Sequence, residues 1–104
     1  MKTTKEQAQS ILEKIQVVAE ARIRPMMGEY IVYIDEKVAG QINHGVLFIK
    51  VTDFGESFAA GLIKESPYDG AKPAFIVPEA KIADTAWMRE FVAGTVSELP
   101  APKK

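Results

Sequence analysis

The sequence of 104 residues contains no cysteine and only one histidine, His44. Without thiols there is no disulfide, no thiolate metal site and no cysteine nucleophile. One imidazole cannot supply the three or four nitrogen and sulfur ligands that zinc usually takes. We therefore predict no metal and no cofactor, and the absence of cysteine favours a cytoplasmic location.

The sequence also lacks an excess of charge and any long apolar run. Thirteen basic and fourteen acidic residues leave a net charge of −1, so no overall field attracts nucleic acid or an anionic membrane. No segment approaches the roughly eighteen apolar residues of a membrane span, and the first ten residues are mostly polar. The length predicts a single domain over residues 1–104, with a frayed tail at 100–104.

Motifs for common catalytic sites are missing as well. The chain has neither the G-x-S-x-G setting of a serine nucleophile nor a glycine-rich phosphate loop. His44 lies in Asn43-His44-Gly45, where a turn residue is a better interpretation than a general base. The carboxylates of Asp35 and Glu36 fall in a second predicted turn, where they are solvated. We predict that the protein is not an enzyme.

Helical periodicity marks both ends of the chain. Apolar residues recur every three or four positions after Thr4, and Thr4 with Gln7 forms a capping box, which predicts a helix to about Ala21. A second helix is predicted to begin after Asp84 and to end at Pro100. Its apolar stripe, which we expect in the core, comprises Trp87, Met88, Phe91, Val92, Thr95, Val96 and Leu99.

The middle of the chain has the composition of strands. The run 29–51 is rich in β-branched and aromatic residues and is broken at 35–37 and 43–45, which predicts a three-stranded meander. A short helix is expected from Asp53 to Gly61, followed by strands at 62–66 and 74–77. The order α-β-β-β-α-β-β-α predicts an α+β fold in two layers, with an antiparallel sheet and the helices packed on one face.

Hairpin register predicts what each face of this sheet carries. A two-residue loop at His44-Gly45 pairs Ile42 with Leu47, and a two-residue loop at the first turn brings Ile31 and Tyr33 to the helix-covered face with Val38, Ile42, Leu47, Ile49 and Val51. The other face then exposes more apolar surface than a small monomer usually does. The last helix is one way to cover it, and a second subunit is the one we favour. We predict a homodimer through Tyr30, Val32, Ile34, Val46 and Phe48.

Three segments resemble the TfoX/Sxy N-terminal domain family. They are Arg22-Ile23-Arg24-Pro25-Met26-Met27-Gly28-Glu29-Tyr30, Lys50-Val51-Thr52-Asp53 and the loop Pro67-Tyr68-Asp69-Gly70-Ala71-Lys72-Pro73. The resemblance covers nearly the whole chain and implies a two-layer α-β(3)-α-β(2)-α fold. Family members include bacterial regulators of natural competence. The resemblance therefore implies a regulatory or protein-interaction domain with an unknown protein partner, and it carries over no catalytic residue.

Cations and tyrosines form the most chemically suggestive group in the sequence. If they met in one patch, they would suit a phosphate or a single-stranded nucleic acid. The small net charge and the lack of a basic stripe favour an ordinary surface role instead. Binding of a small anion or nucleic acid is thus the second hypothesis, with candidate residues Arg22, Arg24, Lys50, Tyr68 and Lys72.

The residues that enter the meander include two methionines and a glycine. We interpret Met26 and Met27 as core filling at a bend, with an adaptable binding surface as the alternative. Gly28 is expected to have a positive φ, because a residue without Cβ turns there without strain.

Overall fold

The computed structural model describes residues 2–101, so positions 102–104 of the predicted tail lie outside the described residues. Within this range six strands form one antiparallel sheet in the order β1-β2-β3-β4-β6-β5. The predicted α+β class with an antiparallel sheet is confirmed. The elements are α1 (Lys5–Gln16), β1 (Ala21–Met26), β2 (Glu29–Ile34), β3 (Lys37–Asn43), β4 (Val46–Lys50), α2 (Asp53–Phe58), β5 (Lys64–Glu65), β6 (Ala74–Val77), α3 (Glu79–Ile82) and α4 (Thr85–Ser97).

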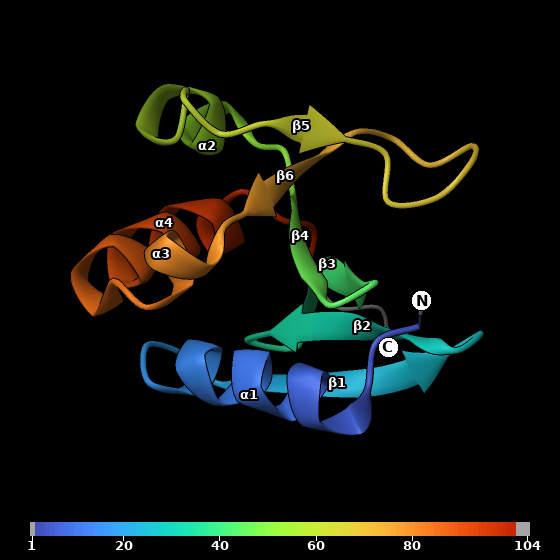
Figure 1. Ribbon diagram of the computed structural model, residues 1–104. Coiled ribbons are helices and arrows are strands. Elements are labelled where there is room, and N and C mark those ends of the chain that lie inside the picture. The colour runs from blue at the N-terminus through green and yellow to red at the C-terminus, as the bar shows by residue number, and fades with distance from the viewer. Residues whose placement is uncertain (1, 102–104) are drawn as a thin grey trace.

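The core lies between the sheet and its helices. Figure 1 shows β1 with α1 at one end of the sheet and β5 with α2 at the other, with α3 and α4 between them. We call the strand face that meets this core the inner face; its buried side chains are Val32, Ile34, Ile42, Leu47, Ile49, Phe75 and Val77. The opposite face is the outer face. Helix residues Ala8, Ile15, Ile82, Met88, Phe91, Val92 and Val96 complete the core.

Helix α1 begins as predicted but ends earlier. The Thr4 side chain accepts a hydrogen bond from the Gln7 backbone N–H, and the Gln7 side chain accepts one from the Thr4 N–H, which confirms the capping box. The last helical residue is Gln16 rather than about Ala21. The chain turns at 17–20 because Ala21 already pairs with Ile34 in the sheet.

Strand β1 is an element that the predicted order lacks. Its side chains alternate, and Ile23 packs against the core while Arg22 and Arg24 are exposed. In the register Met26↔Glu29 and Arg24↔Ile31, Pro25 occupies a position whose nitrogen faces the free edge of the sheet. Proline is tolerated there because no ladder hydrogen bond is lost.

Three two-residue loops connect β1 to β4. All six loop residues have φ between 51° and 86°, the conformation of type I′ hairpins. The positive φ expected of Gly28 is confirmed at 86°. The turn at His44-Gly45 and its predicted pairing, including Ile42↔Leu47 and Gly40↔Ile49, are also confirmed. The loops are Met27-Gly28, Asp35-Glu36 and His44-Gly45.

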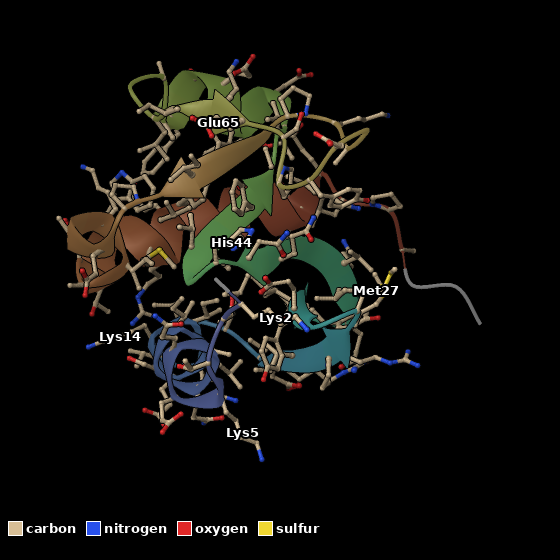
Figure 2. All side chains as sticks on the ribbon, turned by 45° about the vertical axis from the view of Figure 1, so that its right-hand side comes forward. Lys2, Lys5, Lys14, Met27, His44 and Glu65 are labelled. Atoms are coloured by element: carbon tan, nitrogen blue, oxygen red, sulfur yellow. The ribbon has the colours of Figure 1, made fainter. Side chains whose placement is uncertain are left out.

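The two methionines do not fill the core. Met27 is 95% exposed, and Met26 is half exposed. Figure 2 shows Met27 at the tip of the β1–β2 hairpin, away from the body of the protein. The core-filling interpretation is wrong because the chain makes a tight hairpin here, and residues at the tip of such a loop have nothing to pack against.

Replacing Met27 with asparagine is expected to stabilise the protein by about 1 kcal/mol. A left-handed backbone conformation costs most L-residues about 1–2 kcal/mol, and asparagine before glycine tolerates it best. The exposed methionine side chain gives up no packing in exchange. Urea denaturation measures the change, with Met26→Asn as the control, since Met26 has no positive φ. An unchanged or lower midpoint for Met27→Asn would contradict this account.

A β-bulge in β3 contradicts the prediction of which sheet face carries the side chains of the β2–β3 hairpin. The register shifts between Tyr33↔Val38 and Val32↔Gly40, so Ala39 is an extra residue in β3. Ala39 is fully buried in the core. Because side chains alternate along a strand, the extra residue places Val38 on the outer face instead of the inner one.

The prediction that these five residues form one exposed dimer face is therefore wrong. Val32 and Ile34 are 0% and 1% exposed and belong to the core, and Tyr30 packs against it. The bulge pairs Val32 with Gly40 on the inner face and moves Ile31 and Tyr33 to the outer face. Of the predicted set, Val46 and Phe48 lie on the outer face. Phe48 is only 7% exposed within a single chain. The homodimer itself stays a prediction.

Smaller differences occur after β4. Helix α2 is capped by Thr52, whose hydroxyl accepts from the Gly55 N–H at 3.0 Å, and it ends at Phe58, so that Gly61 has no left-handed capping role. Strand β5 keeps only two residues of the predicted 62–66, whereas β6 has the predicted bounds. The short helix α3 is an addition to the predicted order.

The last helix matches its prediction closely. The Asp84 carboxylate accepts a hydrogen bond from the Trp87 N–H at 3.0 Å, as expected of an N-cap. The predicted stripe is buried except for Trp87, which is partly exposed and packs against the core. Thus α4 is placed on the inner face by the residues that the sequence singles out.

Candidate functional site

A groove of about 660 Å³ lies against the outer face of the sheet. Its floor is formed by strand residues, one wall by the loop that joins β5 to β6, and one end by the residues that follow β4 and α4. In Figure 1 this loop extends away from α3 and α4. The lining includes Met26, Ile31, Val38, Gln41, Phe48, Lys50, Val51, Asp53, Tyr68, Lys72, Pro73 and Glu98.

Local hydrogen bonds hold the loop wall in place. The Asn43 side-chain amide donates to the Pro67 carbonyl at 3.0 Å, which ties the loop to the end of β3. Within the loop the Ser66 hydroxyl donates to the Ala71 carbonyl at 2.8 Å. The loop thus lines the groove together with Phe48, which is buried within the single chain.

The end of the groove is fixed by a contact between two helices. The Glu98 carboxylate accepts hydrogen bonds from the backbone N–H groups of Asp53 at 3.1 Å and Phe54 at 2.8 Å. These are the first N–H groups of α2, which have no partners inside the helix, and a carboxylate is favoured at this end by the helix dipole. Glu98 is therefore committed to a structural role.

Three of the five predicted binding residues meet in the groove. Lys50, Tyr68 and Lys72 all line it, although they come from β4 and from two positions of the loop. Among residues 2–101, neither the Lys50 nor the Lys72 ammonium has a hydrogen bond or an ion pair. The groove therefore combines an apolar floor with two uncommitted positive charges.

The two predicted arginines lie elsewhere. The Arg22 guanidinium donates to both oxygens of Glu36, at 3.0 and 3.1 Å, and lies 4.1 Å from the centre of the Tyr33 ring. Its hydrogen bonds hold the pKa of Glu36 below the ordinary value. Arg24 lies on β1, opposite Ile31 of β2, and is not part of the lining. The predicted five-residue cluster thus divides into a groove set and a β1 set.

Sequence reasoning missed most of the apolar lining. Residues 2–101 contain seven large apolar side chains that are exposed, and four of them line the groove: Met26, Val38, Val51 and Tyr68. Tyr68 was predicted as a binding residue, and a binding surface was the alternative interpretation of Met26. No periodicity signals Val38, because its side depends on the bulge at Ala39.

Other kinds of site have little support in the described residues. Residues 2–101 contain no group of three or more His, Cys, Asp or Glu side chains placed to hold a metal. No helix in this range has the length and apolar character needed to cross a bilayer. His44 has a φ of 52° in its hairpin loop, which confirms the turn interpretation.

Glu29 connects three segments at one end of the sheet. Its carboxylate accepts hydrogen bonds from the Thr3 hydroxyl at 2.5 Å and from the backbone N–H groups of Thr3 and His44 at 3.3 and 3.4 Å. The Gly45 N–H in turn donates to the Thr3 hydroxyl oxygen at 2.9 Å. Figure 2 shows Lys2 and His44 where the N-terminal segment passes the hairpins.

Glu29 is expected to make stability depend on pH. Burial raises the pKa of Glu29, but the hydrogen bonds from Thr3 and His44 outweigh it and hold the pKa below its ordinary value of 4.5. A carboxyl with a lowered pKa in the folded state stabilises the fold above its unfolded pKa, and this contribution is lost as the pH falls through the folded pKa. The wild type should therefore lose more stability than Glu29→Gln between about pH 5 and pH 3.

Denaturant titrations of both proteins across this pH range provide the measurement. Glu13→Gln is the matched control, since among the described residues the exposed Glu13 accepts a hydrogen bond only from Gln9 of the same helix. Parallel pH profiles for the wild type and Glu29→Gln would show that the carboxylate does not bind Thr3 and His44 as described.

Comparisons with known proteins give one family relationship. No protein-family model matches the chain. An uncharacterized 12.7 kDa protein in the trpE 5′ region of Spirochaeta aurantia is 33% identical over 82 residues, which are 79% of this chain and 70% of that protein. The chain belongs to the same family. The description of that relative states no activity.

Proposed function

We propose that the protein is a non-enzymatic regulatory or protein-interaction domain of the TfoX N-terminal type, that it acts in the bacterial cytoplasm, and that it contacts a partner through the groove. The observation that carries the proposal is the concentration of exposed apolar side chains there: four of the seven in residues 2–101. A cluster of this kind on a small domain is typical of an interaction surface.

The lining chemistry supports a protein partner. Tyrosine and methionine are enriched in protein interfaces, where they bury large areas. Met26 supplies a flexible side chain at one end of the groove, and Tyr68 supplies a ring on the loop wall. Lysines at the margin add charge that selects the partner more than it adds affinity.

Site-specific photo-crosslinking in the native host tests this proposal. A photo-reactive amino acid at Val38, inside the groove, should give one discrete adduct of higher mass, which mass spectrometry then identifies. The matched control places the same residue at Ile63, which is 64% exposed and outside the groove lining. If Val38 gives no adduct, or the same adducts as Ile63, the proposal is rejected.

A second candidate function is the binding of a small anion or nucleic acid at Lys50, Tyr68 and Lys72. The observation in its favour is that two ammonium groups without partners in residues 2–101 line one groove with an aromatic ring. Retention on a polyanion column should then fall steeply with salt, because phosphate contacts release counterions. The double variant Lys50→Gln with Lys72→Gln should elute at lower salt, whereas Lys5→Gln with Lys14→Gln on α1 should elute like the wild type.

A further inference from the structure

We infer that the groove binds an amphipathic α-helix of a different protein, with the apolar stripe of the helix on the sheet and acidic side chains beside Lys50 and Lys72. The inference rests on the proposed function, because it names the kind of partner that the interaction domain takes. Three properties of the groove lead to it: its floor offers no backbone partners, its apolar surface has the width of a helix, and its uncommitted charge is mostly positive.

The backbone of the floor is paired on both sides, except at Met26 on the edge strand β1. Strands β2, β3, β4 and β6 are all interior strands of the sheet, paired on both sides. An extended peptide lying over these interior strands would find no strand edge, and its own N–H and C=O groups would lie unpaired against apolar side chains. A helix satisfies its backbone internally and presents only side chains. The floor therefore favours a helix over a strand.

The floor also has dimensions that suit a helix. It extends from Met26 on β1 to Phe48 on β4, and three strand spacings of about 4.8 Å make this about 14 Å. A helix with its side chains is about 10–12 Å across. Among the strand residues of the floor, Met26, Ile31, Val38 and Phe48 are apolar, and Gln41 and Lys50 are polar. Leucine-like residues at helical spacing would contact this surface.

Charge distinguishes an acidic helix from a basic one. The lining contains Lys50 and Lys72 and two carboxylates, Asp53 and Glu98. The Glu98 carboxylate is held by two backbone N–H groups of α2, which offset its charge. Within residues 2–101 the Asp53 carboxylate has no hydrogen bond or ion pair, so it opposes one of the two lysine charges. The side chains without partners therefore leave a net positive charge, and acidic flanks on the helix complement it.

A second copy of this chain does not offer such a helix. The exposed positions of α1 are Lys5, Glu6, Gln7, Gln9, Ser10, Glu13, Lys14 and Gln16, and those of α4 are Thr85, Ala86, Arg89, Glu90, Ala93 and Ser97. Neither longer helix has an exposed stripe of large apolar residues. The occupant therefore comes from another protein.

Two synthetic peptides of about fifteen residues test the inference by fluorescence anisotropy. Both carry the same leucine stripe on an alanine-rich helix, and they differ only in having glutamate or lysine at the flanking positions. The wild-type protein should bind the glutamate peptide at least about tenfold more tightly than the lysine peptide. In Lys50→Glu with Lys72→Glu this preference should reverse, because the charge of the groove is reversed.

Further variants separate the groove from the rest of the surface. Val38→Glu and Tyr68→Ser should each lower the affinity for the glutamate peptide at least about tenfold. Tyr68 lies on an exposed loop, where the change does not disturb the core. Ile63→Glu and Lys64→Glu lie outside the lining and should bind like the wild type. Circular dichroism confirms that each variant is folded.

The inference is overturned if neither peptide binds, if both bind equally, or if the variants outside the groove weaken binding as much as those inside. The crosslinking experiment keeps this result distinct from a failure of the proposed function. A discrete Val38 adduct without binding of the glutamate peptide leaves the interaction function standing and rejects the acidic helix as the partner.

Discussion

Replacing Phe91 with alanine is expected to lower the free energy of unfolding by about 3–5 kcal/mol, the cost of removing a fully buried phenylalanine. Phe91 is 0% exposed and lies at the centre of the aromatic cluster. Its ring centroid is 4.7 Å from that of Trp87, 6.0 Å from that of Phe75 and 6.4 Å from that of Phe58. These rings come from α2, β6 and α4, so the cavity would open where three elements meet. Urea denaturation measures the loss.

Trp87→Ala serves as the comparison within the same cluster. Trp87 is the larger side chain, but it is partly exposed, and Lys81 lies over its ring with the ammonium 5.3 Å from the centroid. We expect a cost of about 1–3 kcal/mol. If Trp87→Ala cost more than Phe91→Ala, burial would not be what determines the energetics of this cluster.

Gly40→Ala is expected to cost about 3 kcal/mol or more, an effect as large as that of a core truncation although only one methyl group is added. A Cβ at position 40 would lie 1.9 Å from the Phe48 carbonyl oxygen and 3.0 Å from the Ile49 Cα. Both atoms are backbone of the neighbouring strand, so they cannot move without breaking the β3–β4 ladder. The close approach accompanies the bulge at Ala39.

Gly61→Ala is the matched control for this effect. A Cβ at Gly61 has nothing within 4 Å, and its φ is not positive. Alanine there should be neutral or slightly stabilising, because it restricts the unfolded chain. Thermal unfolding of the two variants side by side makes the comparison, and equal midpoints would contradict the packing described at Gly40.

Local patterns predicted the helices and hairpins well, since the signals lie within a few residues of each element. Thr4 with Gln7 fixes the start of α1, Asp84 fixes the start of α4, and the glycine of His44-Gly45 fixes a loop. Strand β1 was not predicted, because only Ile23 among its central residues packs against the core and Pro25 is atypical of a strand. Its place in the sheet depends on pairing with β2, which no local pattern encodes.

The bulge explains most of what the sequence could not predict about the site. Ala39 looks like any small strand residue, yet its burial as an extra residue decides that Val38 lines the groove and that Val32 joins the core. Lys50, Tyr68 and Lys72 were identified from their chemistry alone. Their meeting depends on the loop over the outer face, which the Asn43 contact to Pro67 helps to hold.

The chain order of the elements has a consequence for the protein as it is synthesised. Strands β1 to β4 are complete at residue 50, and their tight hairpins close within microseconds. Residues 85–99, which cover the inner face, follow about 50 residues later, or roughly 3 to 10 seconds at the usual rate of translation. During this interval the inner-face residues Val32, Ile34, Ile42 and Leu47 lack the cover of α4, although α1 has already been made. The cations and the proline of β1 then disfavour pairing between its free edge and other nascent chains.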